Sequence, residues 1–262
     1  EQAISTETTT VPLAVTIHAE DPAKRLERRL SQFSDRLKDR PDDVELLLSR
    51  GAILRDLDRT TEALQVLTRA VELAPDSADC RYHRGIVYAA AGEHDRAIAD
   101  MEAALARLPA QSAMEAILSN HLAWLYVTGP ARFWNPQRAL KLVHRALRRQ
   151  PGVPGYWNTL GVAHYRDGNW DEAIEALEHS LHESQEPASD LYFLALCYLR
   201  LQEPQRALQY YQQAVYWHEN HAAKLDRGTR DELDQARSEF EAAFVPAGSR
   251  RPSAADAEGA AR

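Results

Sequence analysis

The chain has 262 residues, of which 44% are apolar and 27% are charged, which is ordinary for a globular protein. No stretch approaches the roughly 18 apolar residues needed to cross a bilayer, so the sequence excludes a membrane-spanning helix. The formal net charge of −8 repels a phosphate backbone, and we expect no nucleic-acid partner. Cys80 and Cys197 lie far apart in apolar helical patterns, which favours small core residues over a disulfide or metal site.

The two ends of the chain differ in composition from the rest. The sequence begins at Glu1, and the apolar run VPLAV is too short for a signal core, which favours either a targeting segment already removed or a piece of a longer chain. The compartment stays undetermined. Residues 1–20 are polar and Thr-rich and residues 246–262 contain few large apolar side chains, so both are predicted to be flexible tails.

Internal repetition is the main signal between these ends. Gly51 and Gly85 are separated by about 34 residues, a period typical of helix-turn-helix repeats, and Gly161 recurs in the same local context. Gly92 and Gly168 fall at one repeat position between the two helices, where a left-handed backbone favours glycine. The spacing therefore predicts pairs of helices stacked along the chain.

The repeated segments include YHRGIVYAAAGEHDRAIADMEAALARLP and WNTLGVAHYRDGNWDEAIEALEHSL, and they resemble the tetratricopeptide repeat (TPR) family. The pattern places small residues where two helices cross and large ones opposite, which reports packing and not chemistry. The matching residues are Gly51, Leu54, Ala63, Leu67, Ala70 and Pro75; Gly85, Tyr88, Ala97, Met101, Ala104 and Pro109; Trp157, Leu160, Gly161, Ala173 and Leu177; and Leu194, Ala195, Tyr198, Ala207, Tyr211 and Ala214. Ser180 departs from the pattern, because the last small apolar residue is expected there.

The resemblance implies an all-α, right-handed α-solenoid over residues 21–245. A leading half-unit precedes the first repeat, and a polar amphipathic helix at about 226–243 caps the end. The third unit has a widened turn at 129–134, followed by a helix start at Asn135 and Pro136. The five expected units span about 44–77, 78–111, 112–153, 154–187 and 188–221.

In this family the ligand usually lies in the concave groove lined by the first helices. Side-chain amides there can bond a peptide backbone, and arginines suit carboxylates. The alternative is that some of these side chains only bond neighbouring helices. The Lys and Asn set by which chaperone-binding relatives hold a C-terminal carboxylate is not reproduced, so that ligand is disfavoured. The candidate groove residues are Tyr82, Asn120, Trp124, Asn158, Arg166, Tyr192 and Arg200.

The segment 130–150 reverses the acidic character of the chain. It contains cations and no acidic residue, and its helical spacing places four of them on one face, able to meet an acidic partner or a phosphate. We favour the simpler interpretation that they pair with acids of adjoining helices. Phe133 and Trp134 beside them either anchor a partner or fold back over their own core. The cations are Arg132, Arg138, Lys141, Arg145, Arg148 and Arg149.

Signatures of catalysis are missing from the sequence. His179 with His182, and His218 with His221, lie three residues apart but lack a third ligand, so we expect no metal. No phosphate-binding loop or nucleophile motif is present. We therefore predict a non-catalytic scaffold or adaptor without a cofactor, which binds another protein or a peptide. Two alternatives stay open: a regulatory or targeting region of a larger enzyme, as in TPR arrays attached to bacterial signalling proteins, and a self-assembling TPR protein.

Overall fold

The computed structural model describes residues 21–109 and 112–244, and over these ranges the chain is helical without a strand. Both predicted tails lie outside the described residues. The helices are α1 (Pro22–Asp39), α2 (Val44–Asp56), α3 (Thr60–Leu73), α4 (Ala78–Ala90), α5 (His94–Leu105), α6 (Ala113–Thr128), α7 (Pro136–Arg149), α8 (Pro154–Asp167), α9 (Trp170–Glu183), α10 (Ala188–Arg200), α11 (Pro204–His221) and α12 (Arg227–Ala243), with short 3₁₀ turns η1 (Ala131–Phe133) and η2 (Ala222–Lys224).

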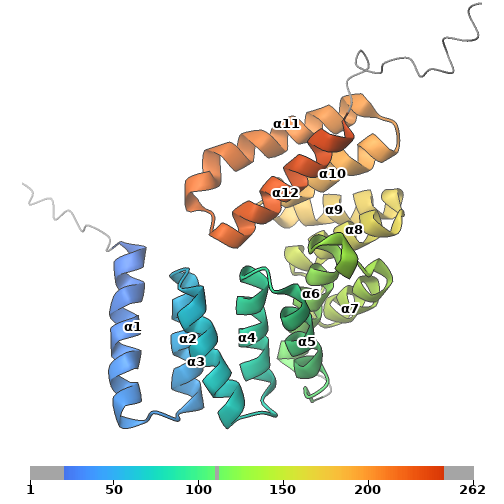
Figure 1. Cartoon of the computed structure of the whole chain (residues 1–262). Helices are drawn as coiled ribbons and strands as arrows, with labels where there is room; N and C mark the ends of the chain where they lie inside the picture. The colour runs from blue at the N-terminus through green and yellow to red at the C-terminus, as the bar shows by residue number, and fades with distance from the viewer. Residues whose placement is uncertain (1–20, 110–111, 245–262) are drawn as a thin grey trace, which may run out of the picture.

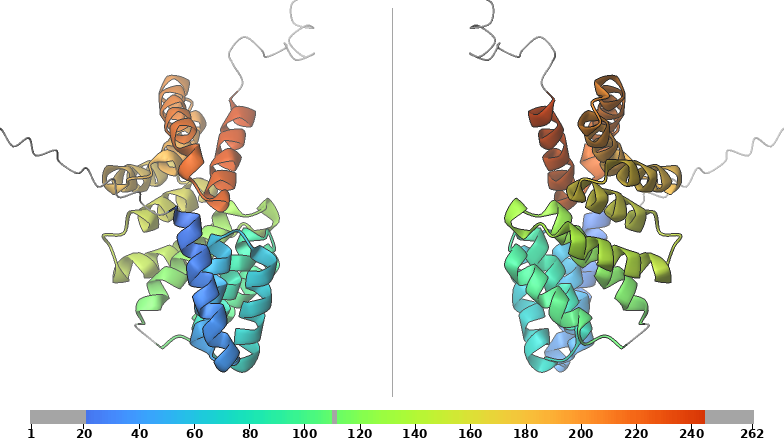
Figure 2. Two further views of the ribbon diagram at one scale, coloured as in Figure 1. Left: turned by 90° about the vertical axis from the view of Figure 1, so that its left-hand side faces the viewer. Right: turned by 90° about the vertical axis from the view of Figure 1, so that its right-hand side faces the viewer.

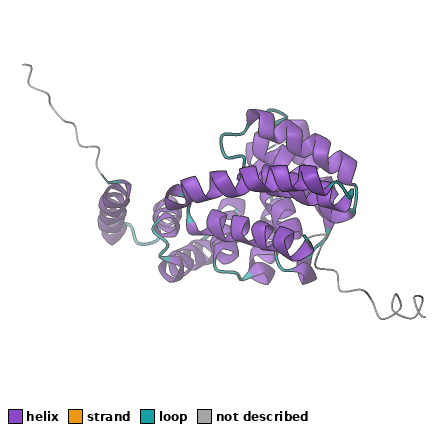
Figure 3. Ribbon diagram, turned by 90° about the horizontal axis from the view of Figure 1, so that it is seen from above, coloured by secondary structure: helices purple, strands orange, loops and turns teal. Residues whose placement is uncertain are grey.

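The helices from α2 to α11 form five successive antiparallel pairs, one within each expected repeat unit. Figure 1 shows α1 to α5 standing side by side, while the helices from α8 onward run across them. The two side views in Figure 2 show the same change of direction along the stack. Figure 3 shows helices connected by short loops throughout the described residues. The fold is thus an all-α solenoid, as the sequence predicts.

Side-chain caps set several of the helix starts. Asp43, Ser77 and Ser112 each accept a backbone N–H of the first turn of α2, α4 and α6, respectively. Asn135 accepts the N–H of Arg138 at 3.1 Å, and Pro136 follows at the first position of α7. Such caps satisfy donors that have no partner inside the helix. The helix start predicted in the widened third unit is therefore present.

The turns inside four of the five pairs share one left-handed residue. Gly92 and Gly168 have φ of +74° and +84°, and Asp58 and Gln202 occupy the same repeat position with φ of 57° and 61°. The backbone requirement is thus a property of the repeat, whichever residue occupies it. Glycine meets this requirement without the steric cost that a side chain brings.

Close packing of the helix pairs explains the glycines inside the helices. A Cβ on Gly161 of α8 would lie 2.5 Å from Cγ of Leu177 on α9, and a Cβ on Gly51 of α2 would lie 2.6 Å from Leu67 on α3. Both leucines are fully buried. The buried apolar residues form two clusters, one from Leu30 to Val87 over α1 to α4 and a larger one from Ala97 to Phe240.

The first helices of successive pairs form the concave side of the solenoid, with direct contacts between α2 and α4, α6 and α8, and α8 and α10. The predicted capping helix is present as α12, and it contacts α10 as well as α11. None of the described helices combines the length and apolarity needed to cross a membrane.

Two glycines of α8 provide a matched test of this packing. Gly161→Ala should lower the free energy of unfolding by about 1–3 kcal/mol, because the methyl group overlaps Leu177. Gly155→Ala should raise it by about 0.5–1 kcal/mol, because nothing lies within 4 Å of its Cβ position and alanine favours the helix. Urea unfolding followed by circular dichroism measures both, and equal effects would contradict the close approach of α8 and α9.

Candidate functional site

Helix α12 lies against the concave side of the solenoid and contacts far more than the last helix pair. It begins after Asp226, whose carboxylate accepts the N–H of Thr229 at 2.9 Å. One apolar stripe of α12, made of Leu233, Ala236 and Phe240, is buried. The Phe240 ring stacks on Tyr211 of α11 at 4.3 Å between centroids. This stripe attaches α12 to the fifth unit.

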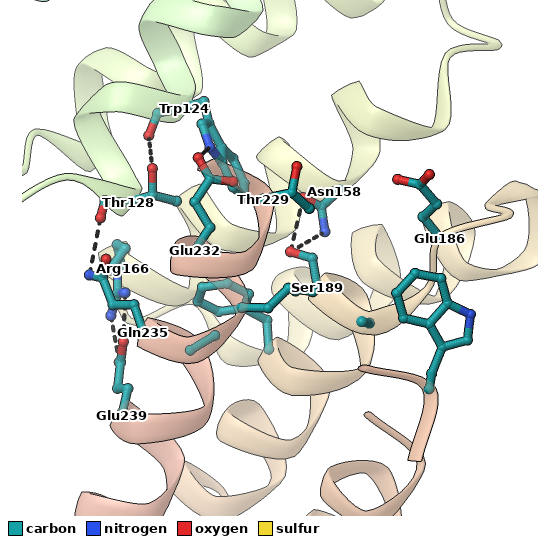
Figure 4. A pocket seen from close by; sticks show the side chains of 15 residues that line it. Trp124, Thr128, Asn158, Arg166, Glu186, Ser189, Thr229, Glu232, Gln235 and Glu239 are labelled. Carbon is teal, nitrogen blue, oxygen red and sulfur yellow. Dashed lines mark hydrogen bonds and ion pairs between the residues drawn. The ribbon is translucent and has the colours of Figure 1, made fainter. Parts of the chain in front are cut away.

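The polar side of α12 extends the contact to earlier units (Figure 4). The indole N–H of Trp124 on α6 donates to Glu232 at 2.8 Å, and Gln235 donates to the carbonyl oxygen of Thr128 at 3.1 Å. At its first residue, Arg227 lies 3.7 Å from Asp58 in the turn after α2. Helix α12 therefore spans the concave side from the fifth unit to the third, with one exposed ion pair to the first.

Arg166 of α8 is the most completely bonded side chain of this contact. Its Nη1 and Nη2 donate to the two carboxylate oxygens of Glu239 on α12 at 2.5 and 2.7 Å, and its Nε donates to the Val127 carbonyl at 2.9 Å. The guanidinium also lies 4.0 Å from the Trp134 ring centre, and the side chain is only 5% exposed. Tyr165 adds a hydrogen bond to the same Glu239 at 2.9 Å.

The arginine proposed for a partner's carboxylate thus already binds a carboxylate of its own chain. Such a two-fold, charge-assisted contact fixes both the direction and the register of α12. Arg200, the other arginine at this repeat position, lies exposed at the end of α10, and its charge acts on the Tyr165 hydroxyl.

The remaining predicted groove residues bond mostly to neighbouring helices. Asn158 donates to Asp190 of α10 at 2.7 Å. The Tyr82 hydroxyl lies 3.3 Å from Nδ1 of His121 on α6. The Asn120 Oδ1 is buried without a hydrogen-bond partner among the described residues. Asn158 and Tyr82 thus contact adjacent units, as in the alternative interpretation.

Tyr192 differs from the prediction of a surface residue. Its side chain is fully buried, and its hydroxyl lies 3.3 Å from Nδ1 of His218 on α11. Large residues of α11 and α12 cover it, because the long α11 and the following helix close over this end of the groove. In this conformation Tyr192 is inaccessible to a partner.

Three of the predicted residues, Trp124, Asn158 and Arg166, line one hollow of about 170 Å³ beneath α12. Figure 4 shows Trp124 and Glu232 toward one side of it, Glu186 on the other, and Asn158 with Ser189 between them. Two further aromatic side chains, Phe193 and Trp217, complete its walls. The hollow is therefore part aromatic and part acidic.

A second hollow of about 470 Å³ adjoins the first. The two share Asn158, Glu186 and Ser189 as lining residues, and the second adds Glu183 and Asp190. Burial raises the pKa of Asp190 to about 6, while hydrogen bonds from Asn158 and Ser180 oppose the shift. Together the two hollows form one trough along α8 and α10.

Glu232 has the most perturbed carboxyl group of the first hollow. Burial raises its pKa to about 7, and the negative charge of Asp226 adds to the shift, while the hydrogen bond from Trp124 opposes it. Part of the side chain remains exposed. The guanidinium of Arg166 is bonded to Glu239, two helical turns further along α12.

Sequence reasoning misses Glu186, Trp217 and Glu232. The apolar stripe of α12 could find Glu232, because such a stripe requires an apolar surface to pack against. It gives no signal for Glu186, between α9 and α10, or for Trp217 on α11. An interpretation of α12 as an end cap alone leaves its polar residues out of the groove.

The cations of the basic segment that lie on α7 divide into two groups. Arg138 pairs with Glu102 of α5 at 2.6 Å, and Arg145 and Arg149 both contact the buried Glu115 of α6. Lys141 and Arg148 are exposed and have no ion pair among the described residues. Three of these five cations thus pair with acids of adjoining helices, which leaves a reduced patch as the candidate anion site.

Other side chains singled out by sequence have structural partners. In the widened turn, Trp134 donates to the Gly129 carbonyl at 2.6 Å and Phe133 stacks on His94, so both fold back. His179 stacks on Trp157 and His221 on Trp217. The thiols of Cys80 and Cys197 are free and buried, and burial raises the pKa of Cys197 to about 12.

The raised pKa of Glu232 predicts a pH-dependent effect on stability. Because its folded pKa of about 7 lies above the ordinary value of 4.5, the folded state holds the proton more tightly, and stability falls as pH rises from 4.5 to 7. Glu232→Gln keeps an oxygen for Trp124 and removes this loss. We expect the variant to melt at a higher temperature than the parent at pH 8 and at the same temperature at pH 4. A difference independent of pH would contradict the assignment.

Comparison with known proteins agrees with this architecture. Two family models described as tetratricopeptide repeat match the chain, one at residues 27–78, 49–113 and 135–190 and the other at residues 191–234. No curated protein sequence matches it.

Solved structures share the fold at low sequence identity. The TPR protein YrrB, described as having an unusual peptide-binding site, is 20% identical over 74% of this chain and 98% of its own, with a TM-score of 0.54. MamA from Desulfovibrio magneticus RS-1 is 17% identical over 68% of this chain and 97% of its own, with a TM-score of 0.56. A chain of the Cut9–Hcn1 complex of the APC/C is 19% identical over 85% of this chain and 47% of its own, with a TM-score of 0.62. The family models cover more than half of the chain. The chain therefore belongs to the tetratricopeptide repeat family.

Proposed function

We propose that this chain is a non-catalytic scaffold that binds a segment of another protein on its concave side. The observation that carries the proposal is the docking of α12 on the concave side, where side chains of α6, α8 and α10 hold the helix. A concave side that holds one helix by an aromatic donor, a buried guanidinium and apolar contacts has the chemistry to hold a protein segment. The similar fold of YrrB, a TPR protein with a peptide-binding site, supports the same function.

The concave side extends beyond α12 toward the N-terminal units. Ile117 is 39% exposed on α6, and it lies on the same helix face as His121 and Trp124, four and seven residues further on. His121 in turn faces Tyr82 of α4. This upstream part offers a partner apolar and aromatic contacts that α12 does not cover, and exposed apolar side chains of this kind contribute to binding.

Position-specific photocrosslinking tests this proposal. The photoreactive residue p-benzoylphenylalanine is placed either at Ile117 or at Tyr216 of α11, which is 73% exposed. In native lysate, we expect the chain carrying it at position 117 to form a defined heterologous adduct that the chain carrying it at 216 does not. The captured protein, purified, should bind the unmodified chain at a 1:1 ratio.

Other outcomes assign other functions. An adduct only at position 216 would contradict concave binding, and an adduct between two copies of this chain would favour the self-assembling alternative. Turnover of a substrate by the purified chain, abolished by one substitution, would contradict the non-catalytic assignment.

A further inference from the structure

The trough beneath α12 contains more carboxyl groups than cations. The two hollows are lined by Glu183, Glu186, Asp190, Glu232 and Glu239, and by one guanidinium, that of Arg166. Arg166 is fully engaged, since it donates from all three of its nitrogens to Glu239 and to the Val127 carbonyl. The trough therefore has an excess of negative charge that no cation among its described lining residues neutralises.

Aromatic side chains stand beside these carboxyl groups. Trp124 and Trp217 belong to α6 and α11, and Phe193 belongs to α10, and all three line the first hollow. The negative faces of such rings attract cations, most strongly when the site is partly withdrawn from water. Carboxylates next to indole rings suit a guanidinium or an ammonium and repel an acidic ligand.

The dimensions of the first hollow limit what can enter it. Its volume of about 170 Å³ is below the roughly 300–1,000 Å³ typical of sites for drug-sized ligands, so it has room for one side chain. The adjoining hollow is larger and polar, with the amide of Asn158 and the hydroxyl of Ser189 at the junction. A peptide backbone following the larger hollow would place one of its side chains over the smaller one.

We propose that this trough binds a basic side chain, arginine in preference to lysine, of the protein segment that the scaffold recognises. This inference rests on the proposed function and specifies its ligand chemistry. The indole rings stack on the planar guanidinium, and Glu186 and Glu232 supply its counter-charges. It also reverses the expectation of an acidic ligand, because Glu239 already neutralises Arg166. In this proposal α12 is one wall of the binding site.

Tryptophan indole resonances provide a direct readout. The probe is N-acetyl-arginine amide, titrated at pH 8 into the ¹⁵N-labelled full chain, and its neutral near-isostere N-acetyl-citrulline amide is the matched ligand control. Trp124→Phe and Trp217→Phe assign the two indole N–H signals. We expect the arginine probe to shift both signals with saturation, the citrulline probe to bind at least tenfold more weakly, and N-acetyl-lysine amide to fall between them.

A pair of variants with equal change in charge completes the test. Glu186→Gln/Glu232→Gln should weaken binding of the arginine probe at least tenfold. Glu45→Gln/Glu175→Gln, which alters two exposed carboxyl groups outside the trough, should leave it within twofold. Equal weakening by the two double variants, equal binding of arginine and citrulline probes, or stronger binding of N-acetyl-glutamate amide would each overturn the proposal.

The experiments distinguish failure of the proposed function from failure of the basic-side-chain inference. A partner that still crosslinks at position 117, in a chain that does not bind the arginine probe, would overturn the basic-side-chain inference alone. Loss of the heterologous adduct at position 117, with the arginine probe still bound, would overturn concave binding of a protein and leave a site for a small cation.

Discussion

The ion pair between Arg166 and Glu239 determines how the C-terminal part of this solenoid is arranged. A guanidinium that is only 5% exposed requires a carboxylate, because an unpaired buried charge is strongly destabilising. In this chain the carboxylate comes from α12, more than seventy residues further along the sequence. Because two nitrogens and both oxygens take part, the pair holds α12 in one register along α8.

The position of α12 determines which surface remains for a partner. With Glu239 on Arg166, the helix places Glu232 beside Trp124 and encloses the hollow with Trp217 and Phe193. The same helix shields Tyr192 together with α11, while the face of α6 around Ile117 stays open. A basic segment lying on this concave side would meet carboxyl groups and indole rings in the trough, and apolar side chains upstream.

The sequence predicts the helix pairs well because their packing repeats. Position 161 requires a small residue because α8 crosses α9 there. Gly168 lies in a turn whose left-handed backbone recurs at Gln202. Both features repeat at a regular spacing, which the sequence reveals. The expected site is harder to predict, because the repeat pattern identifies a groove-facing position and says nothing of what occupies it. Asn158 is a candidate for bonding a partner backbone, yet it bonds Asp190 of the next unit.

Helix α12 shows the same limit. The apolar stripe of Leu233 and Phe240 predicts an amphipathic helix over the right residues, but three buried side chains do not specify which surface they cover. The partner of Arg166 depends on tertiary geometry that one sequence does not encode locally. For that reason the part of the trough formed by Glu232 emerges only when α12 is placed in the groove, whereas Glu183, Glu186 and Asp190 come from α9, α10 and the turn between them.

Hydrogen–deuterium exchange of α12 tests most directly whether the Arg166 pair holds it in place. Glu239→Ala should destabilise the docked helix by about 2 kcal/mol, less than the loss typical of a fully buried pair because Glu239 keeps part of its surface exposed. Exchange of α12 amides should then be roughly 30-fold faster, with α2 to α5 unchanged. Asp231→Ala, at an exposed position of α12, should leave exchange nearly unaltered. Equal exchange of α12 in both variants would contradict the central role of the pair.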